Sequence, residues 1–163
     1  MKTEMTRVNK LYNLPEYQEA QQIIDRHEQD RIFCRHDHQH SLDVARLMYI
    51  FSKESGVDID IELMYAAALM HDIGRALQYI DAVPHHAAGA EMSAQWLPKC
   101  GFTEEETEAV VEAVQDHRQI YQEGPTLKTL LYAADKASRP CYSCGARFMC
   151  NWPEERMNLD LNW

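Results

Sequence analysis

The chain has 163 residues, a formal net charge of −10 and no apolar run of membrane-spanning length. This length predicts one domain with a sizeable core, and the acidic balance argues against a nucleic-acid duplex as partner, because duplex binding needs a basic surface. The first residues lack the apolar segment of a signal peptide, so we expect a cytoplasmic protein with no membrane partner.

Apolar residues recur at helical spacing along most of the chain, and no segment alternates as a strand would. We therefore predict an all-α fold, with residues 1–163 forming a single domain of about six helices. In chain order, the predicted helices run over about 15–33, from 39 or 40 to 56, from 58 or 60 to 71, from 85 or 86 to 97, and over 104–117 and 125–136. A loop containing Pro84 is expected between the third and the fourth. Gly56 is a natural helix end, and Thr103 with Glu106 forms a capping box.

Five predicted helices carry a histidine or carboxylate that extends the core-facing stripe. These residues are His40, His71, His86, His117 and Asp135. Each alone is more often a hydrogen-bonded core or cap residue, but several buried ionisable groups together are costly unless a metal pairs with them. Asp72 follows His71 directly and adds a further ligand. A second His-Asp pair, His36-Asp37, lies in a polar segment; we exclude it and expect His36 and His38 to be exposed or near the cleft.

Three segments between about 38 and 139 resemble the signature of the HD superfamily of metal-dependent phosphohydrolases. They are His40-Ser41-x-x-Val44, His71-Asp72-Ile73-Gly74-Arg75, and Ala134-Asp135-Lys136 followed by Arg139. The resemblance implies an HD-type helical bundle in which one metal ion is held by His40, His71, Asp72 and Asp135. His86 and His117 are similar to the additional ligands of the small bacterial branch that hydrolyses symmetrical dinucleoside polyphosphates. In that branch Asp72 would bridge to a second metal.

The resemblance implies hydrolysis of a phosphate ester or anhydride, of a nucleotide or dinucleotide, by a metal-activated water that Asp72 helps to hold. Imidazole and carboxylate ligands suit one or two ions of iron, manganese, zinc, cobalt or nickel. We expect Arg75, Lys136 and Arg139 to contact the small phosphorylated substrate, with Arg118 a weaker candidate; surface salt bridges are the alternative for all four. Two rival functions stay open: a one-metal 5′-nucleotidase-type enzyme, and a noncatalytic module that senses a nucleotide.

A cysteine-containing extension over 140–163 departs from the pattern of that branch. Cys141-x-x-Cys144 and Cys150 have a spacing that suits a structural zinc or an iron–sulfur cluster when a fourth thiolate is supplied. Cys34 is the favoured fourth ligand and Cys100 the other, because the tail could fold back on the region before His40. The alternatives are simple reduced thiols, or a zinc-stapled element that docks a partner.

Overall fold

The computed structural model describes residues 4–119 and 124–162, and within these ranges it is all-helical. The α-helices are α1 (Thr6–Tyr12), α2 (Pro15–His27), α3 (His38–Glu54), α4 (Ile61–Met70), α5 (Arg75–Asp81), α6 (His85–Cys100), α7 (Glu104–Asp116) and α8 (Leu127–Ala137). Three short 3-10 turns follow: η1 (Cys141–Ser143), η2 (Arg147–Met149) and η3 (Glu154–Arg156). The predicted all-α fold is confirmed for these residues.

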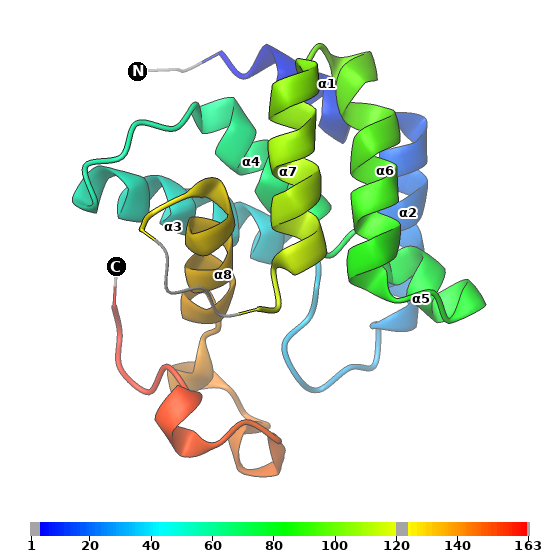
Figure 1. Cartoon of the computed structure of the whole chain (residues 1–163). Coiled ribbons are helices and arrows are strands. Elements are labelled where there is room, and N and C mark those ends of the chain that lie inside the picture. Colours follow the sequence, from blue (N-terminus) through cyan, green and yellow to red (C-terminus); the bar gives the residue numbers. More distant parts are fainter. Residues whose placement is uncertain (1–3, 120–123, 163) are drawn as a thin grey trace.

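Helix α4 is the centre of the bundle (Figure 1). Its last five residues, 66–70, are all buried, and three of them are alanines. Small side chains let neighbouring helices approach closely, and α4 packs against α1, α3, α6, α7 and α8. Because α4 ends directly before His71 and Asp72, the most enclosed helix delivers this pair into the interior of the protein.

Two short helices, α1 and α5, lie outside the predicted set. Helices of seven residues are marginal alone, so tertiary contacts decide whether they form. In α1, Arg7 bonds to Glu62 at 2.8 Å and to Glu106 at 2.7 Å, which ties α1 to the starts of α4 and α7. Helix α5 occupies part of the segment expected to be a loop. Helix α2 also ends at His27, well before the predicted end near residue 33.

The helix starts show the expected caps. Thr103 and Glu106 form the predicted capping box of α7, and Asp60 caps α4. Asp37 caps α3, its carboxylate accepting from the backbone N–H of His40 at 2.9 Å. Helix α8 begins at Leu127, after the cap Thr126, and therefore slightly later than predicted. Caps fix where helices begin and end, and most of the candidate ligands lie at those ends.

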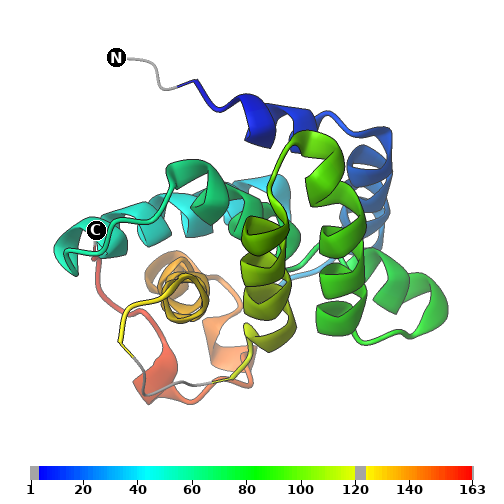
Figure 2. The same ribbon diagram turned by 45° about the horizontal axis from the view of Figure 1, so that its top comes forward.

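The segment after α8 passes beneath the lower ends of α7 and α8 in Figure 1, and Figure 2 shows it from a second direction. The Asn158 side chain donates to the backbone carbonyls of Lys136, Ala137 and Arg139, at 2.8 to 3.1 Å. These carbonyls lie at and just after the end of α8, so the tail caps the helix that carries Asp135. In the described part of the chain, no helix is both long and apolar enough to cross a bilayer.

Candidate metal centre

Five imidazoles and two carboxylates meet in one buried cluster. They are His36 from the loop before α3, His40 in the first turn of α3, His71 and Asp72 after α4, His85 at the start of α6, His117 at the end of α7, and Asp135 in α8. None of these side chains is more than 9% exposed. Such a concentration of ionisable groups away from water requires an internal partner.

Asp72 lies at the centre of the cluster. Its Oδ2 is 3.0 Å from His71 Nε2 and 3.7 Å from His40 Nε2, and its Oδ1 is 3.6 Å from His85 Nε2. The ligand atoms form two groups, each within 4.8 Å: His40, His71 and Asp72, and Asp72, His85 and His117. Asp135 adjoins the first group, with Oδ1 3.4 Å from His40 Nε2. Asp72 belongs to both groups, as a carboxylate bridging two metals would.

Hydrogen bonds to carbonyl oxygens fix the orientation of two of the rings. His71 Nδ1 lies 2.7 Å from the carbonyl of Ala68, and His117 Nδ1 lies 2.6 Å from that of Val114. A carbonyl oxygen only accepts, so each Nδ1 carries the proton. In the neutral ring Nε2 then presents a lone pair to the cluster, which is the arrangement of a metal-binding histidine.

The other three rings are held in the same way. His85 Nδ1 donates to Gln78 Oε1 at 2.9 Å, and His36 Nδ1 donates to Glu28 Oε1 at 2.6 Å. For His40 the acceptor is Ser138 Oγ at 3.3 Å, since that hydroxyl gives its own hydrogen to the carbonyl of Asp135. All five imidazoles therefore turn Nε2 inward.

This arrangement places lone pairs against one another and against carboxylates. The Nε2 atoms of His85 and His117 are 3.4 Å apart, and the Nε2 atoms of His40 and His71 are buried without a hydrogen-bond partner. Unpaired acceptors in a low-dielectric interior repel unless a cation lies between them. Imidazole nitrogen and carboxylate oxygen are ligands for divalent transition metals, so the donor set fits metal ions at both groups.

The surroundings shift the histidine pKa values in opposite directions. Burial alone would lower the pKa of His40, but the nearby carboxylates of Asp135 and Asp72 raise it to about 9. Burial lowers the pKa of His85 to about 3 and that of His117 to about 4. Without metal, a proton on His40 balances the two carboxylates, while His85 and His117 stay neutral and ready to bind metal.

We predict a pH-dependent stability that metal binding removes. Because the pKa of His40 rises from 6.5 to about 9 on folding, the proton stabilises the metal-free protein by about 3 kcal/mol below pH 6.5, and this is lost as the pH rises through 9. Urea unfolding of chelator-treated protein between these pH values measures the loss. Manganese-loaded protein should show no such decline. The same decline in a His40→Gln variant would contradict this account.

The structure brings His40, His71, Asp72, His117 and Asp135 together, as the sequence indicated. His86, which was expected to be a ligand, does not belong to the cluster, and His85 occupies the expected position instead. The His86 ring lies edge-on to that of His85, with centroids 5.8 Å apart, and belongs to neither group. Adjacent helical residues point about 100° apart. Either side chain could extend the wide buried face of α6. The close contact between α5 and α6 sets the orientation of α6 and turns His85 into the cluster.

Sequence reasoning also missed His36, which was expected to be exposed or near the cleft. It is buried, with Nε2 4.0 Å from Asp72 Oδ2. Glu28 accepts from its backbone N–H at 2.8 Å as well as from its ring, and Tyr79 donates to the same carboxylate at 2.5 Å. Burial would raise the pKa of Glu28, but these bonds lower it to about 2. The carboxylate of Glu28 could have indicated that His36 is buried, but the burial of Glu28 itself is visible only in the folded structure.

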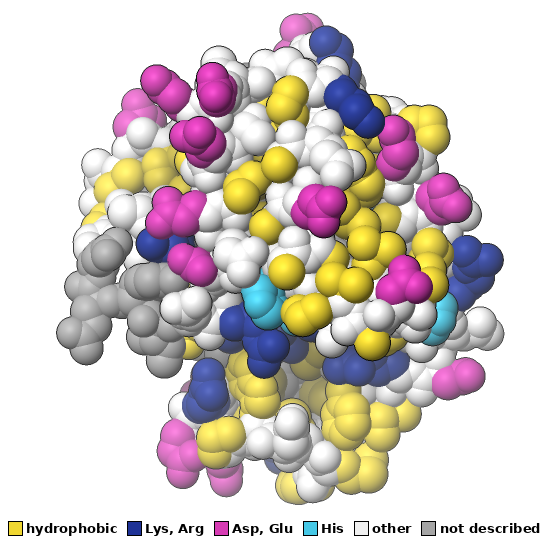
Figure 3. All heavy atoms as spheres, turned by 45° about the vertical axis from the view of Figure 1, so that its right-hand side comes forward, with side chains coloured by type: hydrophobic (Ala, Val, Ile, Leu, Met, Phe, Trp, Pro, Cys, Tyr) yellow, Lys and Arg dark blue, Asp and Glu magenta, His cyan; other side chains and the backbone are white. Residues whose placement is uncertain are grey.

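Four cationic side chains surround the mouth of the centre. A cavity of about 340 Å³ is lined by Asp72, His85, His117 and Asp135 together with Arg75, Arg118, Lys136, Arg139 and Trp152. Cationic groups gather along the furrow between the helical body and the tail in Figure 3. Arg75 Nε contacts Asp72 at 2.8 Å, Arg139 Nη2 contacts Asp135 at 3.1 Å, and Lys136 also contacts Asp135. Arg118 is exposed on the rim.

Comparison with known proteins identifies the family of the chain. The model of the HD domain family matches residues 38–139. An uncharacterised protein of Clostridium beijerinckii is 36% identical over 157 residues, covering 96% of this chain and 99% of that protein. The crystal structure of a predicted HD superfamily hydrolase from an uncultured Thermotogales bacterium matches with a TM-score of 0.65 at 21% identity, over 91% of this chain and 82% of that one.

A helical bundle whose interior holds a histidine, a His-Asp pair and a distal aspartate defines the class of HD domains, and this chain belongs to the HD domain family. HD domains bind divalent metals and are in general metal-dependent phosphohydrolases. Ribonuclease Y of Enterococcus faecalis is 32% identical over 103 residues, covering 62% of this chain. The chain spans only 18% of that ribonuclease, so the likeness concerns one domain of a much longer protein.

Proposed function

We propose that this protein hydrolyses a phosphate ester or anhydride of a nucleotide or dinucleotide. The observation that carries the proposal is the buried histidine–aspartate cluster, part of which lines a cavity together with four cationic side chains, in a chain of net charge −10. Cations kept together in an acidic protein favour a polyanionic substrate. Bound metal ions would lower the pKa of a coordinated water and neutralise phosphate charge.

Side chains of the protein would orient the metal ions and the substrate. Asp72 Oδ1 and Oδ2 face different histidines, so this carboxylate can serve both groups of ligands. Arg75 and Lys136 contact Asp72 and Asp135 and line the same cavity, so they would be available to phosphate oxygens once these carboxylates are engaged as ligands. A guanidinium can hold a phosphate through two hydrogen bonds, which favours Arg75 as the orienting residue.

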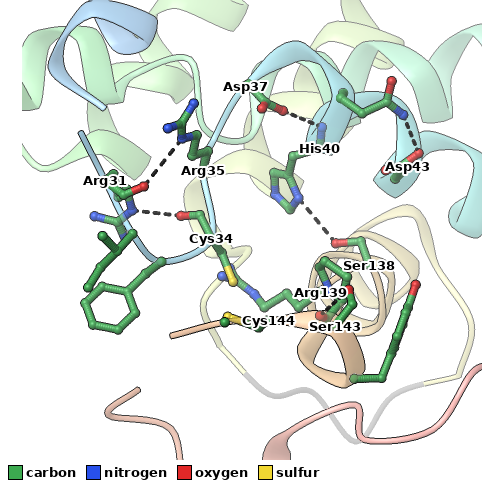
Figure 4. Close-up of a pocket in the computed structure, with 16 residues that line it drawn as sticks. Arg31, Cys34, Arg35, Asp37, His40, Asp43, Ser138, Arg139, Ser143 and Cys144 are labelled. Carbon is green, nitrogen blue, oxygen red and sulfur yellow. Dashed lines mark hydrogen bonds between the residues drawn. The ribbon is translucent and has the colours of Figure 1, made fainter. Parts of the chain in front are cut away.

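Aromatic side chains support a nucleotide rather than a simple phosphate. Trp152 lines the cavity of the metal centre. A neighbouring cavity of about 500 Å³ reaches His40 (Figure 4). The part-exposed rings of Phe33 and Tyr142 also line it. Arg139 lines both cavities. Exposed aromatic faces next to a phosphate site are suited to stack on bases, and two cavities leave room for both ends of a dinucleotide.

The proposal is tested by turnover on a substrate panel. Protein loaded with manganese or iron would be given a symmetrical dinucleoside tetraphosphate, mononucleotides and a short single-stranded RNA, the last because of the likeness to ribonuclease Y. We expect the highest kcat/KM on a nucleotide anhydride or ester. The proposal fails if no compound is turned over faster by the protein than by its Asp72→Asn variant.

Two rival functions predict different experimental results. In a one-metal enzyme, His85→Ala would leave metal content and turnover unchanged; in the two-metal enzyme it removes about one ion per chain, and His86→Ala is the matched control. A noncatalytic sensor would be stabilised against heat by nucleotides without cleaving them. The paired Nε2 atoms of His85 and His117, 3.4 Å apart, favour the two-metal enzyme.

We predict that Arg118 contributes to substrate binding more than to the chemical step. It lies on the rim of the cavity and contacts no candidate ligand, so Arg118→Ala should raise KM by about tenfold while kcat changes little. Steady-state kinetics on the best substrate measure both constants. Arg46→Ala, an exposed arginine that pairs with Asp43 on α3, is the matched control and should leave KM unchanged. A fall in kcat with constant KM would contradict the assignment.

A further inference from the structure

Four of the five cysteines gather at one place in the fold, although Cys34 is more than a hundred residues from the others. Cys34, before α3, and Cys144, in the tail, line the cavity of about 500 Å³ (Figure 4). Cys34 also lines an adjoining cavity of about 410 Å³, together with Cys141 and Cys150. All four are free thiols, and they are buried or half-buried.

The backbone around the tail cysteines forms the tight turns that thiolate metal sites use. Cys141 opens η1, and the N–H of Cys144 donates back to the carbonyl of Cys141 at 3.2 Å. Cys150 follows η2, with its N–H bonded to the carbonyl of Arg147 at 3.1 Å. A two-residue spacing within such a turn lets both thiols face the same side, which is the usual geometry of half a structural zinc site.

The tail buries little apolar surface of its own. Between residues 140 and 162 only Cys141 and Ala146 are buried apolar residues, while Phe148 is 90% exposed and Met149 is 65% exposed. Three turns of three residues cannot bury enough apolar surface to offset the entropy of ordering more than twenty residues. Segments of this kind are commonly fixed by a metal.

The charges around the cysteines suit a thiolate cluster. The adjoining cavity is lined by Arg31 and Arg139 and by no carboxylate. Arg139 Nε is buried without a hydrogen-bond partner. Zinc with four thiolates carries a net charge of −2, and two guanidinium groups would balance it.

We propose that Cys34, Cys141, Cys144 and Cys150 bind one zinc ion, which fastens the tail to the loop before α3. Within the described residues, no three of these sulfur atoms lie within 4.8 Å of one another. A tetrahedral zinc site needs sulfur atoms about 3.8 Å apart. Rotation of a cysteine between staggered rotamers moves its sulfur by about 3 Å, and binding of the ion would require such rotations. The four thiols release their protons on binding.

The site would also support the metal centre from outside. Arg139 lies between the two: its Nη2 contacts Asp135 at 3.1 Å, and its guanidinium stacks over Trp152 with 4.9 Å to the ring centroid. Fixing the tail therefore fixes the neighbours of a candidate ligand. The zinc site itself does not depend on hydrolysis, so the two proposals can fail separately.

Cobalt substitution and zinc analysis of the full chain test the proposal. Cobalt added to metal-free, reduced protein should give the sulfur-to-cobalt charge-transfer band and the intense d–d bands of a tetrahedral thiolate site, at about one equivalent. Asp72→Asn should keep these bands, since it affects only the histidine–aspartate centre. The double variant Cys141→Ser/Cys144→Ser should lose them, together with about one zinc per chain. Cys100→Ala, which alters the buried thiol at the end of α6, is the matched control.

Three results would overturn the proposal. Cobalt spectra of the unmodified chain without a sulfur charge-transfer band would exclude a thiolate site, and this measurement does not depend on whether a variant folds. A sulfide-containing chromophore in protein purified without oxygen would assign the thiols to an iron–sulfur cluster instead. Unchanged zinc content in the double cysteine variant would place the zinc elsewhere.

Discussion

Replacing Asp72 by asparagine should lower kcat by about 10³-fold or more and reduce the bound metal from two ions per chain to at most one. The substitution keeps the volume of the side chain but removes the charge that faces both groups of histidines. The amide can offer only one oxygen, whereas the carboxylate places one oxygen 3.0 Å from His71 Nε2 and the other 3.6 Å from His85 Nε2.

Metal content by elemental analysis and single-turnover kinetics measure the two effects. Asp58→Asn is the matched control, because the Asp58 side chain is fully exposed and should leave both quantities unchanged. Circular dichroism checks that the Asp72→Asn variant retains its helices. A folded variant that keeps two ions and near-normal kcat would show that Asp72 is not the bridging ligand.

Replacing Gly74 by alanine should destabilise the protein by about 3 kcal/mol or more and disturb the second group of ligands. A Cβ at Gly74 would lie 2.0 Å from the carbonyl oxygen of His85 and 2.4 Å from the backbone nitrogen of Gly89. Both atoms belong to the backbone of α6, so no side-chain rotation can relieve the clash. Helix α6 must move, and His85 moves with it.

Urea unfolding and metal titration test this prediction. Gly124→Ala is the matched control: its Cβ would meet nothing within 4 Å, and no left-handed backbone angle opposes the substitution. We expect the Gly74→Ala variant to lose the second ion in preference to the first, because His40 and His71 do not lie on α6. Normal stability in Gly74→Ala would contradict the close packing of α5 on α6.

The sequence was sufficient to predict the cluster residues that extend strongly apolar helices. His71 follows the run of small apolar residues in α4, His117 closes a helix with a good capping box, and Asp135 lies on the buried face of α8. In α7 and α8 the period of the helix determines which side faces inward, whereas the end of α4 is buried on all sides. The all-helical fold class follows from the same periodicity.

The two errors at the site have different physical causes. His85 and His86 are neighbours at the start of a helix with a wide buried face, so the helical period favours neither, and the packing of α5 against α6 decides. His36 lies in an irregular segment before α3, where no period applies. Its position depends on the buried carboxylate of Glu28 in the turn that follows α2.

Anomalous diffraction from a manganese-loaded crystal tests most directly whether the inward-facing histidines hold two metal ions. We expect two peaks bridged by Asp72, one in contact with His40, His71 and Asp135 and the other in contact with His85 and His117. Peaks absent from this cluster, or a second ion held by His86 instead of His85, would contradict it.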